Sequence, residues 1–222
     1  HICRDLPKRG PGSEGEKAAS EYMAGVLKDK CGCETTYIES FKENPGSFLG
    51  WLYFTLTFSL AGYLLFWFVP VAGAVLVALG FAIMIAQFIF YKKVVDKFFP
   101  EMTGTNVTAI KKCKGEVKAR IFYNGHQDAA WNWPVNEKFG GLVYEMHILL
   151  TVIGGLFNLA ICIAAAIIVD GGVGVATPEI YGALFWVGVA GAIFVPITIG
   201  LYFMWDENTI VDGANDNLTG CY

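Results

Sequence analysis

The sequence predicts an α/β domain whose chain is interrupted by four transmembrane helices. Of the 222 residues, 55% are hydrophobic and only 16% are charged, whereas charged residues make up about a quarter of an ordinary soluble domain. The apolar residues gather in four long runs, and the polar segments between them carry helix-like and strand-like patterns. We therefore expect one part of the chain in a lipid bilayer and another part in water.

The four apolar runs contain no Asp, Glu, Lys or Arg. A membrane-spanning helix needs about 20 apolar residues, and each run is long enough. The alternative is a set of buried helices in a soluble core, but such helices normally keep a polar face. Aromatic residues near the ends of the runs are typical of the membrane interface. The predicted spans are residues 48–69, 71–91, 148–169 and 180–204.

The spans form two pairs. A very tight turn at residues 70–73 separates the first two, and residues 170–179 join the last two. Each pair therefore returns the chain to the side of the membrane that it left. The sequence predicts two transmembrane hairpins, 48–91 and 146–205, inserted into one peptidase-like domain made of residues 1–47, 92–145 and 206–222.

The charges beside the hairpins predict which side this domain occupies. Lys42, Lys92, Lys93 and Lys97 flank the first hairpin on the side of the domain, whereas the far loop of the second hairpin has acidic residues and no Lys or Arg. Positive charge favours the cytoplasmic side. We expect an integral, multi-pass membrane protein with its polar domain in the cytoplasm.

The polar segments have their own signals. Ser13 and Glu16 match a capping box and predict a helix through about Lys28. The glycines of "GPGSEG" imitate a dinucleotide-binding loop, but no strand precedes them, and the cap explains them better. Strands are predicted at residues 35–41, 106–111 and 117–123, which gives a mixed sheet with flanking helices.

Two polar motifs mark a candidate metal site. "YNGHQDAAW" places His126 and Asp128 directly after the last predicted strand, where sites form in open α/β sheets. "DGANDNLTG" concentrates Asp and Asn residues between two glycines after the fourth span. An ordinary loop is the alternative for each motif taken alone.

Together, these stretches resemble the zinc aminopeptidases of metallopeptidase family 28. The resemblance lies in "RGPGSEGEKAASEYMAGVL", in "NVTAIKKCKGEVKARIFYNGHQDAA" and in "GANDNLTG". It covers nearly all of the polar residues and none of the spans. A related zinc exopeptidase family typically has a lysine after its bridging aspartate, and "NLTG" lacks that lysine. The resemblance implies a phosphorylase/hydrolase-like zinc-peptidase fold and an aminopeptidase that hydrolyses peptides with two zinc ions.

The resemblance also implies a role for individual residues. His126 would bind one zinc ion, and Asp216 would bridge both ions. Asp128 would orient the catalytic site without binding metal. Asn217 would support an unusual turn that has a cis peptide bond in the family, and Gly213 would support the same loop. Imidazole and carboxylate groups suit zinc, and two zinc ions activate a water molecule and polarise a peptide carbonyl.

The chain departs from the family pattern in two ways. The family needs a Glu-Glu pair, another acidic ligand and a histidine after the bridging aspartate, and the chain ends six residues after Asp216. We therefore expect an incomplete fragment that is inactive by itself. The connection from Asp128 to Asp216 is also long, because the second hairpin fills it. Loops tolerate such insertions well.

Other function classes are weighed against this one. The net charge of −4 and the lack of a basic block argue against a nucleic-acid partner. The spans carry no ionisable side chains of the kind that a transporter or channel would need. The six cysteines form no disulfide framework, although Cys31 and Cys33 are spaced for a weak metal site. A non-catalytic, peptidase-like membrane scaffold or receptor domain stays the main alternative.

Overall fold

The computed structural model describes residues 1–169 and 173–221. The chain divides into two compact units. The polar unit contains His1–Pro45, Pro100–Asn132 and the residues from Asp206 onward, and the helical unit contains Gly46–Phe99 and Trp133–Trp205. Three polar segments that are far apart in the sequence thus form a single compact unit.

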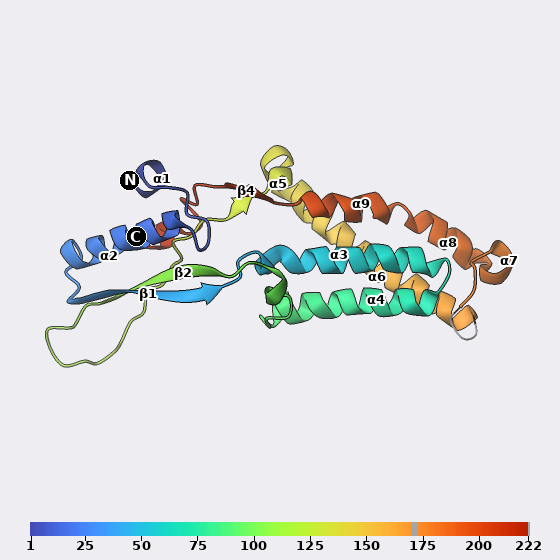
Figure 1. The fold of residues 1–222 in the computed structure, drawn as a ribbon, viewed down its shortest axis with the longest axis horizontal. Helices are drawn as coiled ribbons and strands as arrows, with labels where there is room; N and C mark the ends of the chain where they lie inside the picture. The colour runs from blue at the N-terminus through green and yellow to red at the C-terminus, as the bar shows by residue number, and fades with distance from the viewer. Residues whose placement is uncertain (170–172, 222) are drawn as a thin grey trace. The chain divides into compact units, whose positions relative to one another are not determined.

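The helical unit contains four helices that are long and apolar enough to cross a membrane: Ser47–Phe66, Pro70–Ile89, Gly141–Ile168 and Ala183–Phe203. Figure 1 shows α3 and α4 running side by side, with α6 packed along them. Short helices complete the unit. The elements are α3 (Ser47–Phe66), α4 (Pro70–Met84), the π-helix η1 (Ile85–Ile89), η2 (Asp96–Phe98), α5 (Pro134–Phe139), α6 (Gly141–Ile168), α7 (Pro178–Tyr181), α8 (Ala183–Gly191), α9 (Phe194–Gly200) and η3 (Leu201–Phe203).

Small residues let α3 and α4 approach closely. A Cβ atom on Gly62 would lie 2.4 Å from Val77 Cγ2 and 3.0 Å from the carbonyl oxygen of Gly73. The buried Asn158 of α6 donates to the carbonyl oxygen of Ser59 (2.6 Å). Small residues and interhelical hydrogen bonds are the usual means of helix association in a bilayer, where hydrophobic burial gives little driving force between helices. These contacts join α3, α4 and α6.

Prolines set two helix boundaries differently from the prediction. The predicted turn at residues 70–73 is wrong, because Pro70 is the first residue of α4 and the turn is formed by residues 67–69. A proline is suited to this position, where its missing N–H would have no helical acceptor. The fourth span is broken between α8 and α9. Pro196 cannot donate to the carbonyl oxygen of Ala192, four residues earlier, so the regular ladder stops there.

The second connection is only partly described. Its first residues, including Asp170, lie outside the described residues. Residues 173–177 are irregular, and Thr177 caps α7 by accepting a hydrogen bond from the backbone N–H of Ile180 (3.4 Å). Helix α6 starts at Gly141, seven residues before the predicted span. The stacked rings of Trp133 and Tyr144, with centroids 4.9 Å apart, pack its first turn against the segment before α5.

In the polar unit, α2 (Glu14–Asp29) lies beside the sheet of β1 (Thr35–Glu43) and β2 (Met102–Ile110) (Figure 1). The predicted cap of α2 is confirmed, since Ser13 Oγ accepts a hydrogen bond from the N–H of Glu16 (3.3 Å). The second hydrogen bond of a capping box, from the backbone N–H of Ser13 to the side chain of Glu16, is not formed. The N–H of Ser13 is already bonded to the carbonyl oxygen of Gly10, and the carboxylate of Glu16 accepts from Gly12 N–H instead.

Strands β1 and β2 are antiparallel, with Thr35 opposite Ile110 and Glu43 opposite Met102. The first two predicted strands are therefore confirmed, with shifted ends. A second antiparallel pair is formed by β3 (Trp131–Asn132) and β4 (Asp206–Ile210). The remaining elements of the unit are α1 (Ile2–Asp5) and η4 (Leu218–Cys221).

The predicted strand at residues 117–123 is wrong, and so is the expected mixed sheet. These residues have no regular structure, and their large side chains are exposed, with Phe122 at 88% and Tyr123 at 91%. The sequence has the alternation of a strand, but a strand also needs a neighbouring backbone with which to pair. Within residues 1–169 and 173–221, the sheets are the two antiparallel pairs alone.

Candidate functional site

The polar unit brings together three of the predicted site residues. His126 Nδ1 lies 3.0 Å from Asp128 Oδ1, and His126 Nε2 lies 3.3 Å from Asp216 Oδ1. The side chains of His126 and Asp216 are 54% and 77% exposed, and that of Asp128 is 35% exposed. The two ring nitrogens of one histidine thus face carboxylates from two segments that lie far apart in the sequence.

The residue between His126 and Asp128 explains why both point the same way. Gln127 is buried, and its side-chain amide donates to Ser20 Oγ (3.0 Å) and to the carbonyl oxygen of Thr105. Successive side chains of an extended chain point to opposite sides. Because Gln127 points into the unit, its two neighbours point out together. The His-x-Asp spacing is therefore held by an inward glutamine rather than by the end of a strand.

The anchor of Gln127 belongs to a larger buried network. Glu16 Oε1 accepts hydrogen bonds from the N–H of Thr105 (2.8 Å) and from its hydroxyl (3.3 Å). The hydroxyls of Ser20 and Thr105 lie 2.8 Å apart. Buried polar groups of this kind are stable because each finds a partner. The network ties α2 and β2 to the segment that carries His126.

Arg9 joins this segment to the loop that carries Asp216. Its side chain is only 2% exposed. Its Nε donates to the carbonyl oxygen of Gln127 (2.7 Å), and its Nη2 donates to the carbonyl oxygens of Asp212 (2.7 Å) and Gly213 (3.4 Å). The carbonyl oxygen of Arg9 also accepts from the N–H of Ala129 (2.7 Å). One guanidinium group therefore holds both halves of the site in register.

The loop of Asp216 depends on close backbone contacts. Gly213 has a φ of +56°, and a Cβ atom there would lie 2.9 Å from Arg9 Nη2 and from the carbonyl oxygen of Asp216. A side chain would therefore be strained and crowded at this position. The peptide bond between Asp216 and Asn217 is cis, as the resemblance implies. The buried Oδ1 of Asn217 has no hydrogen-bond partner in the part of the chain that the structure describes.

Gly125 keeps the two segments close together. A Cβ atom on Gly125 would lie 2.8 Å from Asn217 Oδ1 and 2.9 Å from the carbonyl carbon of Gly220. Gly125, Arg9 and Gln127 were not predicted as site residues. An arginine beside a lysine near the start of a chain is usually exposed, so nothing in the sequence marks Arg9. Glycine next to the His-x-Asp motif was the only available signal.

Charges around the site shift the pKa of nearby groups. The ammonium of Lys8 hydrogen-bonds Asp212 Oδ1 and lowers the pKa of that carboxyl group, and Arg9 lowers it further. Burial, followed by the charges of Glu16 and Asp128, raises the pKa of Glu43. Burial also raises the pKa of the Cys221 thiol, whose sulfur lies 3.4 Å from the carbonyl oxygen of His126. The acidic groups near Glu43 make this part of the unit attractive to a cation.

Replacing Glu43 by glutamine should stabilise the polar unit at neutral pH. Because the folded pKa is raised, the folded state loses stability as the pH rises above the ordinary pKa of the carboxyl group. We expect a higher thermal midpoint for Glu43→Gln at pH 7 and no difference at about pH 4. Circular dichroism at both values measures this. Glu39→Gln, at an exposed position on the same strand, is the control, and an equal gain there would contradict the explanation.

His126 and Asp216 fit two ligands of one zinc ion. Ligand atoms about 2.1 Å from a tetrahedral zinc are about 3.4 Å apart, and His126 Nε2 and Asp216 Oδ1 are 3.3 Å apart. In the tautomer whose Nδ1–H donates to Asp128, Nε2 has a lone pair for a metal, which is the usual arrangement of a ligating histidine. The described residues contain no group of three or more His, Cys, Asp or Glu that could hold a metal ion. The chain therefore fits part of a zinc site.

The cysteines do not add to this site. All six are free thiols in the described structure, and Cys31 is exposed with Cys33 partly buried beside it. His147 belongs to α6 in the helical unit, and its Nε2 donates to the carbonyl oxygen of Ile197 (2.8 Å).

Comparison with protein-family models, with curated proteins and with solved structures found no match to this chain.

Proposed function

We propose that this protein is a membrane-anchored zinc metallopeptidase, of the aminopeptidase type, whose polar unit supplies His126 and Asp216 to a two-zinc site. The observation that carries the proposal is the convergence of these two side chains from segments separated by a whole membrane hairpin. Tertiary contacts bring the two segments together. Strand β3, which follows His126, pairs with β4, which precedes Asp216, and Arg9 donates hydrogen bonds to both segments.

Each residue has a distinct part in the proposed site. His126 would bind zinc through Nε2, and Asp128 would hold the ring with its other nitrogen protonated. Asp216 would contribute its exposed carboxylate, and Gly213 and Asn217 would shape its loop. When bound, a pair of zinc ions supplies an activated water and polarises the peptide carbonyl. The substrate would be a peptide with a free N-terminus, as the resemblance to family 28 implies.

The proposed activity needs more groups than the described residues supply. The resemblance requires a general-base glutamate and further ligands, and no third ligand stands near His126 and Asp216 in the described structure. We therefore expect the described residues to bind zinc weakly when no further ligand joins them. The same observation favours the second candidate, a non-catalytic peptidase-like membrane scaffold.

A zinc titration of the purified chain in detergent, against a chromophoric chelator, tests the metal site. We expect His126→Ala to lower zinc affinity at least about tenfold, because it removes one of the two ligands. His1→Ala is a matched control. His1 is another exposed histidine paired with a carboxylate, with its Nδ1 2.6 Å from Asp5 Oδ2. Equal zinc affinity in the two variants would contradict the assignment of His126.

A second measurement separates the peptidase from the scaffold. Protein purified from its source membranes should cleave aminoacyl anilides, lose this activity to a chelator and regain it with zinc. His126→Ala should abolish the cleavage. If the protein binds zinc at His126 and cleaves no anilide under these conditions, the scaffold is the correct alternative.

A further inference from the structure

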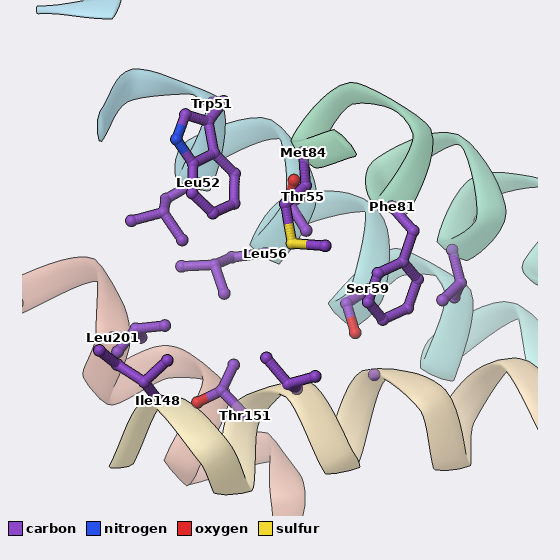
Figure 2. Close-up of a pocket in the computed structure, with 13 residues that line it drawn as sticks. Trp51, Leu52, Thr55, Leu56, Ser59, Phe81, Met84, Ile148, Thr151 and Leu201 are labelled. Carbon is purple, nitrogen blue, oxygen red and sulfur yellow. The ribbon is translucent and has the colours of Figure 1, made fainter. Parts of the chain in front are cut away.

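An apolar cavity lies inside the helical unit, at the end where α3 begins and η1 ends. Its volume is about 60 Å³. Figure 2 shows side chains from α3, α4, α6 and η3 pointing into the space between these helices. Leu52, Leu56, Met84 and Ile148 form much of the wall. Apolar cavities of this kind stay dry and accept apolar ligands, and in a bilayer the abundant apolar ligand is a lipid acyl chain.

Trp51 lines the same cavity and has an unsatisfied polar atom. The residue is 7% exposed, and its Nε1 is buried with no hydrogen-bond partner in the described structure. In Figure 2, this nitrogen lies on the side of the ring that faces away from Phe81 and Ser59. Buried indole N–H groups usually find an acceptor. Because this nitrogen has almost no accessible surface, it does not open onto the cavity, which is lined by the carbon atoms of the ring.

A basic segment is fixed at the same end of the helical unit. The N–H of Lys92 donates to the carbonyl oxygen of Ala86 (2.8 Å), two residues from Met84 of the cavity wall. Gln87 Oε1 accepts from the N–H groups of Val94 (2.8 Å) and Val95 (3.1 Å). The segment after η1 therefore folds back on its last turn, which keeps Lys92 within about one helical turn of the cavity.

Aromatic contacts attach this segment to the start of α3. The rings of Phe88 and Trp51 have centroids 5.3 Å apart, and those of Phe98 and Phe54 are 5.2 Å apart. A Cβ atom on Gly50 would lie 2.0 Å from Phe99 Cζ, so the ring of Phe99 covers this glycine. The lysines are therefore carried by a segment that is packed on the helix that bears Trp51.

The positive charge of the segment is not neutralised nearby. Lys92, Lys93 and Lys97 are exposed, and none forms an ion pair within residues 1–169 and 173–221. The acidic residue of the segment, Asp96, accepts a hydrogen bond from Gln87 Nε2 (2.7 Å). Basic residues next to a membrane helix attract anionic lipid headgroups.

We propose that the helical unit binds an anionic glycerophospholipid, with part of an acyl chain in the cavity and the phosphate at Lys92 and Lys93. The inference is independent of the zinc site, because all of these residues belong to the helical unit.

Native mass spectrometry of the delipidated chain in detergent tests the headgroup. Dioleoyl phosphatidylglycerol and dioleoyl phosphatidylcholine are titrated separately. We expect tighter binding of phosphatidylglycerol and an about tenfold loss of its affinity in Lys92→Gln/Lys93→Gln. Lys28→Gln/Lys30→Gln, which removes the same charge from the polar unit, is the control and should bind as the unaltered chain does. Equal binding of the two lipids, or an equal loss in both variants, would overturn the proposal.

The cavity and Trp51 are tested with other variants. Leu56→Phe fills the cavity and should weaken phosphatidylglycerol binding while the preference over phosphatidylcholine remains. Phosphatidylglycerol with brominated acyl chains should quench tryptophan fluorescence, and Trp51→Phe should remove most of this quenching. If Leu56→Phe, monodisperse and helical by circular dichroism, binds as tightly as the unaltered chain, or if quenching is the same without Trp51, the lipid is not in the cavity.

Discussion

Replacing Arg9 by methionine should separate the two halves of the candidate site and destabilise the polar unit. The substitution removes a donor from the carbonyl oxygen of the buried Gln127 and from that of Asp212, a residue that is itself exposed. An unsatisfied buried acceptor costs about 1–3 kcal/mol, so the free energy of unfolding should fall by about 1–3 kcal/mol. Thermal unfolding and amide hydrogen exchange at residues 126–130 and 212–218 measure the loss.

Two further variants define the role of Arg9. Arg4→Met removes an exposed arginine from α1 of the same unit and should have little effect. Arg9→Lys keeps the charge but lacks the planar fork that reaches both segments, and we expect an intermediate loss. Faster exchange should appear in both segments together, because one side chain holds them. If Arg9→Met lowers the free energy of unfolding no more than Arg4→Met does, Arg9 does not hold the two segments together.

Replacing Gly62 by alanine should destabilise the helical unit by about 1–3 kcal/mol, the usual cost of overpacking. The new methyl group would lie 2.4 Å from Val77 Cγ2 and 3.0 Å from the carbonyl oxygen of Gly73. Val77 is β-branched and almost fully buried, so its side chain has little room to turn. The two helices must therefore shift apart. Thermal unfolding in detergent measures the change.

Replacing Gly25 by alanine should instead raise the free energy of unfolding. Gly25 lies in α2, and a Cβ atom there meets nothing within 4 Å. Alanine in such an open helical position stabilises by about 0.5–1 kcal/mol relative to glycine. Val77→Ala combined with Gly62→Ala should recover part of the loss, because it removes the nearer contact and leaves the backbone contact. A neutral effect of Gly62→Ala would show that α3 and α4 do not cross at this point.

The sequence predicted the elements that depend on composition and local pattern. The four spans follow from the absence of charge over long runs, and the start of α2 follows from Ser13. Strands β1 and β2 were found because both are rich in residues that favour strands and are bounded by turns. The predicted helix boundaries were less accurate near Pro70 and Pro196, because the missing N–H of a single proline determines where a helix begins or is interrupted.

The sequence indicated the exposed polar residues of the candidate site but not the buried residues that hold them in place. His126, Asp128 and Asp216 carry polar groups that are rare in this chain, so their motifs stand out. Arg9 and Gln127 act through backbone carbonyl oxygens and an inward side chain, which leave no pattern in a sequence. The strand expected at residues 117–123 failed for a related reason, since alternation records propensity and not the presence of a partner strand.

The close packing of Phe99 on Gly46 and Gly50 has a consequence for chain connectivity. It brings together the points where the chain enters and leaves the first hairpin. Glu43 and Met102, which are paired in β1 and β2, are then separated by a closed module rather than by a long flexible loop. The entropy of closing that loop is already lost when the hairpin has formed. The first helical hairpin therefore shortens the effective connection between β1 and β2.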